Sequence, residues 1–350
     1  MSREAIIGCI LGTAVGDALG LPYEGLSPER AKRMLGPPDR HRFFFRRGMV
    51  SDDTEHTCMV AQSLIEARGD VEIFATRFAS RLRWWIIGLP AGVGKATARS
   101  GIRLWLGFKP WNAGVNSAGN GPAMRAAIFG AAFDDLPLML AMVRASSRLT
   151  HTDPKAEFGS IAVALAAKHS RENGSVDANA WLTDVADAVG NEGAELIELL
   201  RRVLISIESK ETTIAFASSL GLAKGVTGYT YHTVPVAIHA WLSFPREFEQ
   251  AVMTIIQCGG DADTTAAIVG GIVGAGVGRE GIPSEWLDGI CEWPGSVSWM
   301  HVLGETLSDS IANAAPVHAP AINPLAVLFR NLFFLAIVLV HGFRRLAPPY

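Results

Sequence analysis

Two short acidic segments carry the side chains of this chain that are best suited to chemistry. Residues 51–55 read SDDTE, and residues 259–265 read GGDADTT. Magnesium is a hard cation that binds carboxylate, hydroxyl and water oxygens, and proteins usually hold it with only a few carboxylates. The adjacent carboxylates of Asp52 and Asp53 repel each other unless they are solvated, paired or bridged by a cation. The two segments are therefore predicted to form the two halves of one oxygen-ligated metal site.

The same segments also fit a structural role at the start of a helix. Asp-Asp-Thr precedes a run of apolar residues with helical spacing, and the second segment precedes the apolar residues 266–274. Short polar residues at such positions are typical helix caps. A helix N-terminus holds acidic side chains rigidly, and its dipole favours their ionised form. Capping and metal binding are therefore compatible.

Composition excludes several classes of protein. Hydrophobic residues make up 49% of the chain and charged residues 19%, which excludes disorder and predicts a densely buried interior. The net charge of -3 and the lack of basic runs beyond Arg46-Arg47 and Arg344-Arg345 argue against a nucleic-acid polymer as partner. The four cysteines show no CxxC spacing, which fits buried, reduced thiols and a cytoplasmic location. The apolar residues 5–15 lack a convincing cleavage site after them, so we expect no export.

Apolar residues with helical spacing dominate most of the chain. Ile6, Ile10, Leu11 and Ala14 form one such set, and alternation typical of a strand is limited to residues 227–236. These patterns predict a compact all-α single domain of roughly fifteen short helices whose connecting loops supply the chemistry. We expect residues 1–315 to form the catalytic domain and residues 316–350 to form a hydrophobic helical tail.

Two loop segments interrupt the helical pattern. Residues 26–50 contain three prolines and the run Phe43-Phe44-Phe45-Arg46-Arg47, and they directly precede the first acidic segment, so they are predicted to form a lid over the site. Residues 109–122 are rich in Gly and Asn and precede a helix. Such a loop offers backbone NH donors that suit a phosphate, although the same composition also describes an ordinary turn.

The C-terminal segment, residues 324–350, approaches the apolar length of a membrane-spanning helix. Arg330 and Asn331 fall inside it, and a charge at the centre of a membrane costs about 2.5 to 3.5 kcal/mol. We therefore expect a helix that closes the core. Attachment to a membrane surface, helped by Arg344-Arg345, is the alternative that we do not favour.

Five motifs in order give the chain a resemblance to the ADP-ribosylglycohydrolase family. They are GDALG at 16–20 with Tyr23-Glu24, SDDT at 51–54, GNG at 119–121 with Met124-Arg125, THT at 150–152, and GGDADT at 259–264. The resemblance covers residues 4–310 and leaves the C-terminal tail outside. It implies an orthogonal multi-helix bundle with a di-magnesium cleft, in which two Mg²⁺ ions, or Mn²⁺ as an alternative, lie between the acidic motifs.

The resemblance also implies roles for individual residues. The implied metal ligands are Ser51, Asp52, Asp53, Asp261, Asp263 and Thr264, the implied catalytic residues are Glu24 and Asp53, and the implied substrate contacts are Ser117, Gly119, Asn120, Gly121, His151 and Tyr229. Ser51 stands where the family usually has threonine and keeps the hydroxyl. Considered without the family, Glu24 is typical of a solvated helix end, His151 of a core histidine and Asp17 of a paired structural acid.

The implied reaction is hydrolysis of the glycosidic bond between ADP-ribose and an acceptor, with release of ADP-ribose. The acceptor is an ADP-ribosylated protein side chain or a small molecule, and the sequence leaves this choice open. One alternative is a non-catalytic ADP-ribose-binding or structural protein on the same fold. A different two-metal hydrolase, such as a phosphatase, is disfavoured because His56 is the one histidine beside the acidic segments, and many such sites use imidazole ligands.

Overall fold

The computed structural model describes residues 3–172, 176–312 and 318–346. Over these residues the chain forms eighteen α-helices and four short 3-10 helices, and its only β-pairing consists of isolated bridges. The all-α prediction is confirmed, whereas the predicted boundary between residues 315 and 316 lies outside the described residues. The α-helices are α1 Arg3–Gly20, α2 Pro28–Leu35, α3 Asp52–Ala67, α4 Val71–Ile87, α5 Lys95–Trp105, α6 Pro110–Ala113, α7 Ala127–Ala132, α8 Leu136–Thr150, α9 Pro154–Glu172, α10 Ala178–Val189, α11 Ala194–Glu208, α12 Thr213–Ser219, α13 Thr230–Ser243, α14 Phe248–Gln257, α15 Ala262–Val277, α16 Ser284–Gly289, α17 Val297–Ala312 and α18 Pro324–Arg345.

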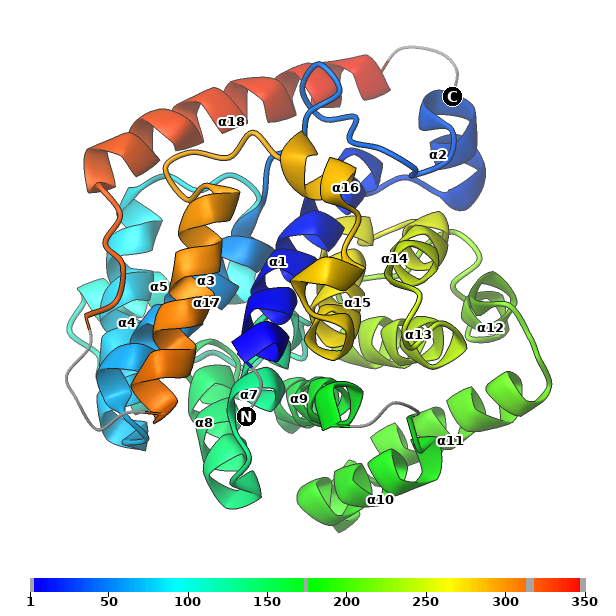
Figure 1. Cartoon of the computed structure of the whole chain (residues 1–350), viewed down its shortest axis with the longest axis horizontal. Coiled ribbons are helices and arrows are strands. Elements are labelled where there is room, and N and C mark those ends of the chain that lie inside the picture. The colour runs from blue at the N-terminus through cyan, green and yellow to red at the C-terminus, as the bar shows by residue number, and fades with distance from the viewer. Residues whose placement is uncertain (1–2, 173–175, 313–317, 347–350) are drawn as a thin grey trace.

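Two helices in contact along their length, α1 and α15, form the centre of the bundle (Figure 1). Small residues at every fourth position of α1 face small residues of α15. A Cβ atom added at Gly16 would lie 2.0 Å from the carbonyl oxygen of Ala266, and one added at Gly270 would lie 2.2 Å from that of Gly12. Because no side chain fits between them, the two backbones are in direct contact. The fourfold spacing of Gly8, Gly12, Gly16 and Gly20 is visible in the sequence and is the signal for this contact.

This helix pair is antiparallel, which sets the position of the acidic segments. The contacts run from Gly8 with Gly274 to Gly20 with Ala262, so the C-terminal end of α1 lies beside the N-terminal end of α15. Helix α3 packs against both members of the pair. The start of α3, the end of α1 and the start of α15 therefore meet in one place.

Replacement of Gly16 by valine is expected to lower the free energy of unfolding by about 3 kcal/mol or more, because the side chain forces the two central helices apart. Urea unfolding of the full chain measures this effect. Gly342→Ala is the matched control, because nothing lies within 4 Å of the added Cβ and residue 342 is helical. A Gly16→Val protein as stable as the wild type would contradict the backbone contact.

The segment predicted to alternate like a strand, residues 227–236, is largely helical. Helix α13 begins at Thr230, and its first twelve positions except His232 are buried. A helix that is buried on all sides needs apolar residues everywhere, so its sequence loses the 3.6-residue period that distinguishes it from a strand. The strand-like interpretation is therefore wrong.

The four cysteines are free thiols. Cys9, Cys58 and Cys258 are buried, and Cys291 is partly buried. Burial raises the pKa of the Cys9 and Cys58 thiols, which leaves them protonated and unreactive at neutral pH. They act as packing residues, as the sequence predicts.

Helix α18 crosses the outside of the bundle (Figure 1) instead of closing its core. Only Arg330, Asn331, Phe334 and Ile337 of this helix are buried. The expectation of a core helix is wrong because Arg330 and Asn331 find partners inside the protein and face inward, which leaves most of the apolar side chains of α18 facing outward. By length and apolar composition, α1 and α18 are the two candidate membrane spans in the described part of the chain, and residues 5–20 of α1 are all buried inside the protein.

Candidate active site

A cleft of about 350 Å³ opens at the place where the three helix ends meet. Both acidic segments line it, and so does the Gly/Asn-rich loop that precedes η2 (Ala123–Arg125). The predicted site residues on its surface are Glu24, Ser51, Asp52, Ser117, Gly119, Asn120, Gly121, His151, Asp261, Asp263 and Thr264. The fold thus brings together segments that are far apart in the sequence.

The Asp53 carboxylate lies behind the cleft surface, where the two acidic segments touch. The Ser51 hydroxyl donates a hydrogen bond of 3.0 Å to Asp53 Oδ2, and the Thr264 hydroxyl donates one of 3.3 Å to the same oxygen. Asp53 is 1% exposed, and its other oxygen, Oδ1, has no hydrogen-bond partner. A buried carboxylate oxygen without a donor is costly, so Asp53 is suited to a cation.

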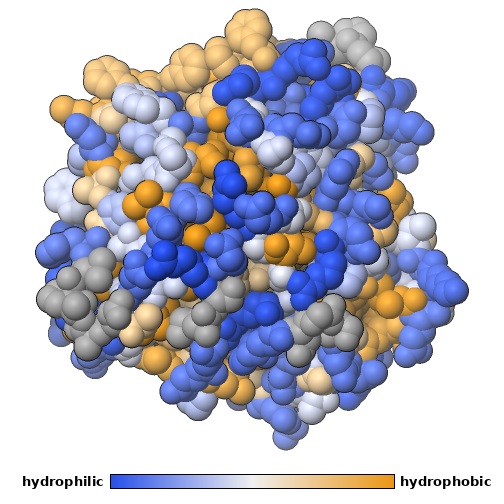
Figure 2. Space-filling view, viewed as in Figure 1, coloured by the Kyte–Doolittle hydropathy of each residue, from blue (hydrophilic) through white to orange (hydrophobic). Residues whose placement is uncertain are grey.

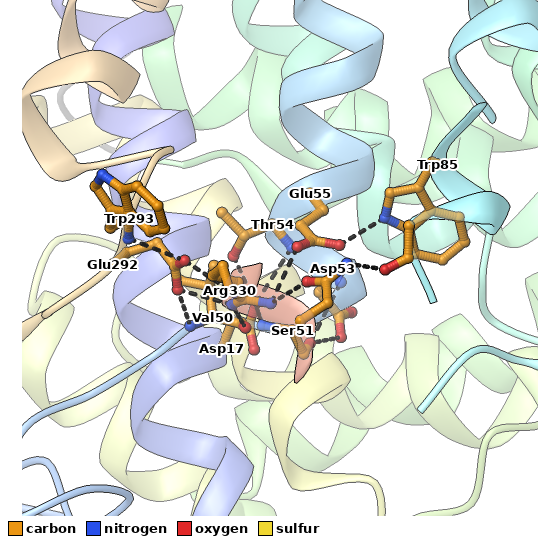
Figure 3. A network of polar contacts seen from close by, with 12 residues as sticks. Asp17, Val50, Ser51, Asp53, Thr54, Glu55, Trp85, Glu292, Trp293 and Arg330 are labelled. Atoms are coloured by element: carbon orange, nitrogen blue, oxygen red, sulfur yellow. Dashed lines mark hydrogen bonds and ion pairs between the residues drawn. The ribbon is translucent and has the colours of Figure 1, made fainter. Parts of the chain in front are cut away.

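Asp17, near the C-terminal end of α1, fixes the first turn of α3 (Figure 3). Its Oδ2 accepts hydrogen bonds from the Ser51 amide at 2.8 Å, the Thr54 amide at 3.2 Å and the Thr54 hydroxyl at 2.5 Å. These are the helix-capping and pairing contacts expected of a structural aspartate. Its Oδ1 is buried and has no partner, like that of Asp53.

The second acidic segment is shaped by its two glycines. Gly259 and Gly260 have φ values of 67° and 79°, and a Cβ at Gly260 would lie 2.0 Å from the Val226 carbonyl oxygen. This tight turn leads into Asp261, whose Oδ2 accepts a hydrogen bond of 2.5 Å from the Asn120 side-chain amide. Asn120 therefore connects the Gly/Asn-rich loop to the acidic segment.

The cleft holds several carboxylates close together and therefore carries an excess of negative charge. Burial raises the pKa of Asp52, Asp53 and Asp263 well above the usual range, and neighbouring carboxylates raise it further. Burial also raises the pKa of Asp17 to about 6. At neutral pH these carboxylates destabilise one another unless a cation neutralises them.

The side chains present fit a hard divalent cation. The donors are carboxylates and hydroxyls, and two buried carboxylate oxygens lack partners. In residues 3–172, 176–312 and 318–346, no three Asp, Glu, His or Cys side chains already converge as a finished metal site. The fit therefore rests on the donor set, the unpartnered oxygens and the excess negative charge.

His151 lies deep in the cleft as a neutral imidazole. Burial, followed by the charge of Arg125, lowers the pKa of His151 to about 3. Its Nδ1 is hydrogen-bonded to the Thr150 hydroxyl at 2.8 Å, and a Cβ added at Gly119 would lie 3.1 Å from its Nε2. This ring nitrogen therefore faces the Gly/Asn-rich loop.

Tyr229 stands apart from the other predicted contacts. Its backbone pairs with Gly119, but its hydroxyl accepts a hydrogen bond of 3.1 Å from Lys155 Nζ and its ring lies against Tyr231. The side chain does not line the cleft. Contact of Tyr229 with the adenosine end of a substrate stays a prediction.

Two parts of the cleft wall were not predicted from the sequence. The first is the N-terminal end of α5, which contributes Gly92, Gly94, Lys95 and Thr97, and the second is α18, which contributes Phe334 and Val338. The sequence signal for the first was the pattern GVGKAT at 92–97, a glycine-rich turn before a helix. The predicted lid is wrong, because none of residues 26–50 lines the cleft.

Arg330 of α18 anchors that helix directly behind the first acidic segment. It donates hydrogen bonds to Glu292 Oε1 at 2.7 Å and to Glu55 Oε1 at 3.1 Å, and it also bonds the Val50 carbonyl oxygen (Figure 3). The Trp85 indole donates a hydrogen bond of 2.6 Å to the other oxygen of Glu55.

A second cavity, of about 810 Å³ and mainly apolar, lies beneath the N-terminal half of α18 and ends at the Arg330 network. Arg330 pairs with Glu55 and Glu292, the two carboxylates that line this second cavity. The second cavity therefore lacks the excess negative charge of the cleft.

Replacement of Arg330 by alanine is expected to lower the free energy of unfolding by about 3 to 5 kcal/mol, because Glu55 and Glu292 lose their cation while they remain buried. Urea unfolding measures this change. Arg344→Ala, at an exposed position of the same helix, is expected to change stability by less than about 0.5 kcal/mol. Equal stability of the two variants would refute the anchoring role.

Comparison with known proteins agrees with the fold. The chain matches the ADP-ribosylglycohydrolase family over residues 1–317. An uncharacterized protein from Archaeoglobus fulgidus is 31% identical over 305 residues, which is 82% of this chain and 92% of that protein. ADP-ribosyl-[dinitrogen reductase] glycohydrolase from Rhodospirillum rubrum is 26% identical over 81% of this chain and 90% of its own length, and ADP-ribosylhydrolase ARH3 from Gallus gallus is 28% identical over 80% and 87%. A solved structure named ADP-ribosylglycohydrolase-related protein complex has a TM-score of 0.59 and 25% identity, and it covers 88% of this chain and 98% of that chain.

The chain belongs to the ADP-ribosylglycohydrolase family. It is accordingly a glycosidic hydrolase that acts on ADP-ribose linkages. Helix α18, which begins at Pro324, lies beyond the residues that the family match covers. The wall formed by Phe334 and Val338 is therefore an addition to the family domain.

Proposed function

We propose that this chain is a magnesium-dependent hydrolase that removes ADP-ribose from an acceptor, either a protein side chain or a small molecule. The meeting of Ser51, Asp53 and Thr264 carries the proposal, because it joins the two oxygen-rich segments at one end of a cleft. The Gly/Asn-rich loop lines the same cleft, and a loop of this kind before a helix would suit a diphosphate. The names of the relatives from R. rubrum and G. gallus, which specify ADP-ribosyl and ADP-ribosylhydrolase activities, support an ADP-ribosylated substrate.

Six side chains would hold two Mg²⁺ ions, with Mn²⁺ as a substitute: Ser51, Asp52, Asp53, Asp261, Asp263 and Thr264. When bound, the ions would neutralise the carboxylates, grip ribose hydroxyls and lower the pKa of a water molecule. The unpartnered Oδ1 of Asp53 supports this proposal, because a buried carboxylate oxygen without a hydrogen-bond partner is free to bind a cation.

Glu24 is proposed to move a proton at the scissile bond. It lines the cleft beside the second acidic segment, and its pKa is raised by loss of hydration and then by the charge of Asp261. A raised pKa favours the protonated form of a carboxyl group, and this is the form that can give a proton to a leaving group. Asp53 is proposed to orient the attacking water, and the surrounding carboxylates would stabilise positive charge that develops on the ribose ring.

The Gly/Asn-rich loop is proposed to bind the diphosphate through the residues Ser117, Gly119, Asn120 and Gly121. Lys95, at the N-terminal end of α5 on the cleft wall, would add positive charge. His151 would contact ribose or phosphate oxygens as a neutral imidazole. The adenosine end would extend toward Tyr229, whose backbone pairs with Gly119.

A panel of defined substrates tests the proposal. Arginine-linked, serine-linked and acetyl-linked ADP-ribose are incubated with the full chain and Mg²⁺ or a chelator, and free ADP-ribose is measured by chromatography. We expect release from at least one substrate in Mg²⁺ alone. Binding of ADP-ribose without release from any of them would favour a non-catalytic binding protein, and phosphate release from simple esters would favour a phosphatase.

A further inference from the structure

The outward face of α18 carries an unbroken apolar stripe. The outer stripe consists of Leu325, Phe329, Leu332, Ala336, Leu339 and Phe343, all of which are exposed. Their spacing alternates between four and three residues, which keeps them on one side of a helix for about 27 Å. Figure 2 shows tan and orange side chains projecting over this helix.

Helix α18 buries polar side chains and exposes apolar ones, which is the reverse of a typical helix on the surface of a water-soluble protein. Its central Arg330 and Asn331 are 6% and 1% exposed, whereas Leu325 and Phe343 are 67% and 70% exposed. The inward position of Arg330 is fixed by its ion pairs, so α18 cannot rotate to bury the stripe without leaving Glu55 and Glu292 unpaired. The ion pairs of Arg330 therefore keep the outer stripe exposed, and no segment in the described part of the chain packs over it.

Charge around the stripe is complementary to an anionic surface. The described residues of the tail, 318–346, contain no Asp or Glu. Exposed Arg344 stands at the end of the helix, and exposed Arg46 stands in the loop beside it. That loop is joined to α18 by an edge contact between Phe44 and Phe333 with ring centroids 5.2 Å apart. Phe45, next to Arg46 in the chain and in ring contact with Phe44, is 87% exposed and adds to the apolar surface.

A lipid surface fits these observations better than a second copy or a spanning helix. Stable protein interfaces use about 20 to 30 residues from each partner, which is far more than the outer stripe offers. If α18 spanned the bilayer, Arg330 would lose Glu55 and Glu292 and would lie in the hydrocarbon core. A helix that lies in the plane of the bilayer keeps Arg330 paired and buries only the apolar side.

We propose that the outer stripe of α18, together with Phe45 and its flanking arginines, seats the protein on the surface of an anionic phospholipid bilayer. Apolar side chains enter the boundary between headgroups and acyl chains, and the guanidinium groups contact lipid phosphates. The opposite face of α18 contributes Phe334 and Val338 to the cleft wall, so docking places the cleft next to the bilayer.

Vesicle flotation of the full chain tests this proposal. The vesicles contain either phosphatidylcholine alone or equal parts of phosphatidylcholine and phosphatidylglycerol. We expect the wild type to float with the mixed vesicles, and the pair Leu339→Ser and Phe343→Ser to lower the ratio of bound to free protein by about tenfold or more. The pair Arg46→Gln and Arg344→Gln is expected to weaken binding to mixed vesicles by about tenfold. Binding of this variant to vesicles of phosphatidylcholine alone should equal that of the wild type.

The matched control removes two exposed isoleucines on the far side of the molecule. Ile205 of α11 and Ile214 of α12 are 62% and 39% exposed, and the pair Ile205→Ser and Ile214→Ser is expected to bind vesicles like the wild type. Thermal unfolding verifies that every variant is folded. The proposal is overturned if the wild type does not float with mixed vesicles or if the serine pair in α18 floats equally well. A wild-type dimer that the α18 serine pair dissociates, seen by light scattering without vesicle binding, would also overturn it and would assign the stripe to a second copy.

Discussion

The Asp261→Asn protein is expected to release ADP-ribose about a thousandfold more slowly than the wild type, or slower still, because it loses a negative charge from the proposed ion site. The change is nearly isosteric. Asp261 Oδ2 accepts a hydrogen bond from the Asn120 side chain, and the amide oxygen of asparagine can accept the same bond. The fold should therefore remain intact while the chemistry fails. Initial rates of ADP-ribose release at saturating Mg²⁺ measure the effect.

The control for this experiment is Asp187→Asn, which makes the same chemical change at an exposed position of α10. It is expected to leave the rate unchanged. Thermal unfolding without metal separates loss of chemistry from loss of structure. Because burial raises the pKa of Asp261, removal of its charge should maintain or increase the stability of the metal-free protein. An Asp261→Asn enzyme with the wild-type rate would refute the site.

Removal of divalent cations is expected to abolish activity and also to lower stability. Burial and mutual repulsion raise the pKa of Asp52, Asp53 and Asp263, so a bound cation relieves an unfavourable charge in the folded state alone. A ligand at about a hundred times its dissociation constant stabilises a protein by about 2.7 kcal/mol. For a chain of this size, this corresponds to a Tm increase of about 3 to 5 °C.

Thermal unfolding with chelator and with increasing Mg²⁺ measures that increase. The Asp53→Asn and Asp263→Asn double variant is the control, because it removes two of the proposed ligands. Its Tm should be insensitive to Mg²⁺ and should exceed that of the metal-free wild type, since two repelling charges are gone. A wild-type Tm that does not respond to Mg²⁺, Mn²⁺ or chelator would contradict the metal site even if the enzyme were active.

The sequence predicted the helical class and the convergence of the acidic segments for physical reasons. Helical periodicity survives in amphipathic helices, and adjacent buried carboxylates have few stable arrangements. The structural role of Asp17 followed from the need to pair a buried acid, and its three accepted hydrogen bonds agree with that need. The close contact of α1 with α15 was not predicted, although the fourfold glycine spacing of α1 is a signal for it in the sequence.

The cleft wall was harder to predict because it depends on tertiary packing. Residues 26–50 looked like a lid because they precede Ser51 in the chain. In the fold Leu26 pairs with Gly260, and the later part of the segment is bonded to α16 and α18, so the segment does not cover the cleft. The tail looked like a core helix because its composition is apolar. Only the positions of Glu55 and Glu292 show that Arg330 faces inward, and these residues are distant from the tail in sequence.

The metal site itself is tested most directly by a crystal of the wild-type protein soaked in Mn²⁺ and measured for anomalous scattering. We expect anomalous density between residues 51–53 and residues 261–264, within about 2.0 to 2.6 Å of carboxylate and hydroxyl oxygens. Absence of density there at a Mn²⁺ concentration that restores activity to chelator-treated enzyme would contradict the claim that the two acidic segments share a bound cation.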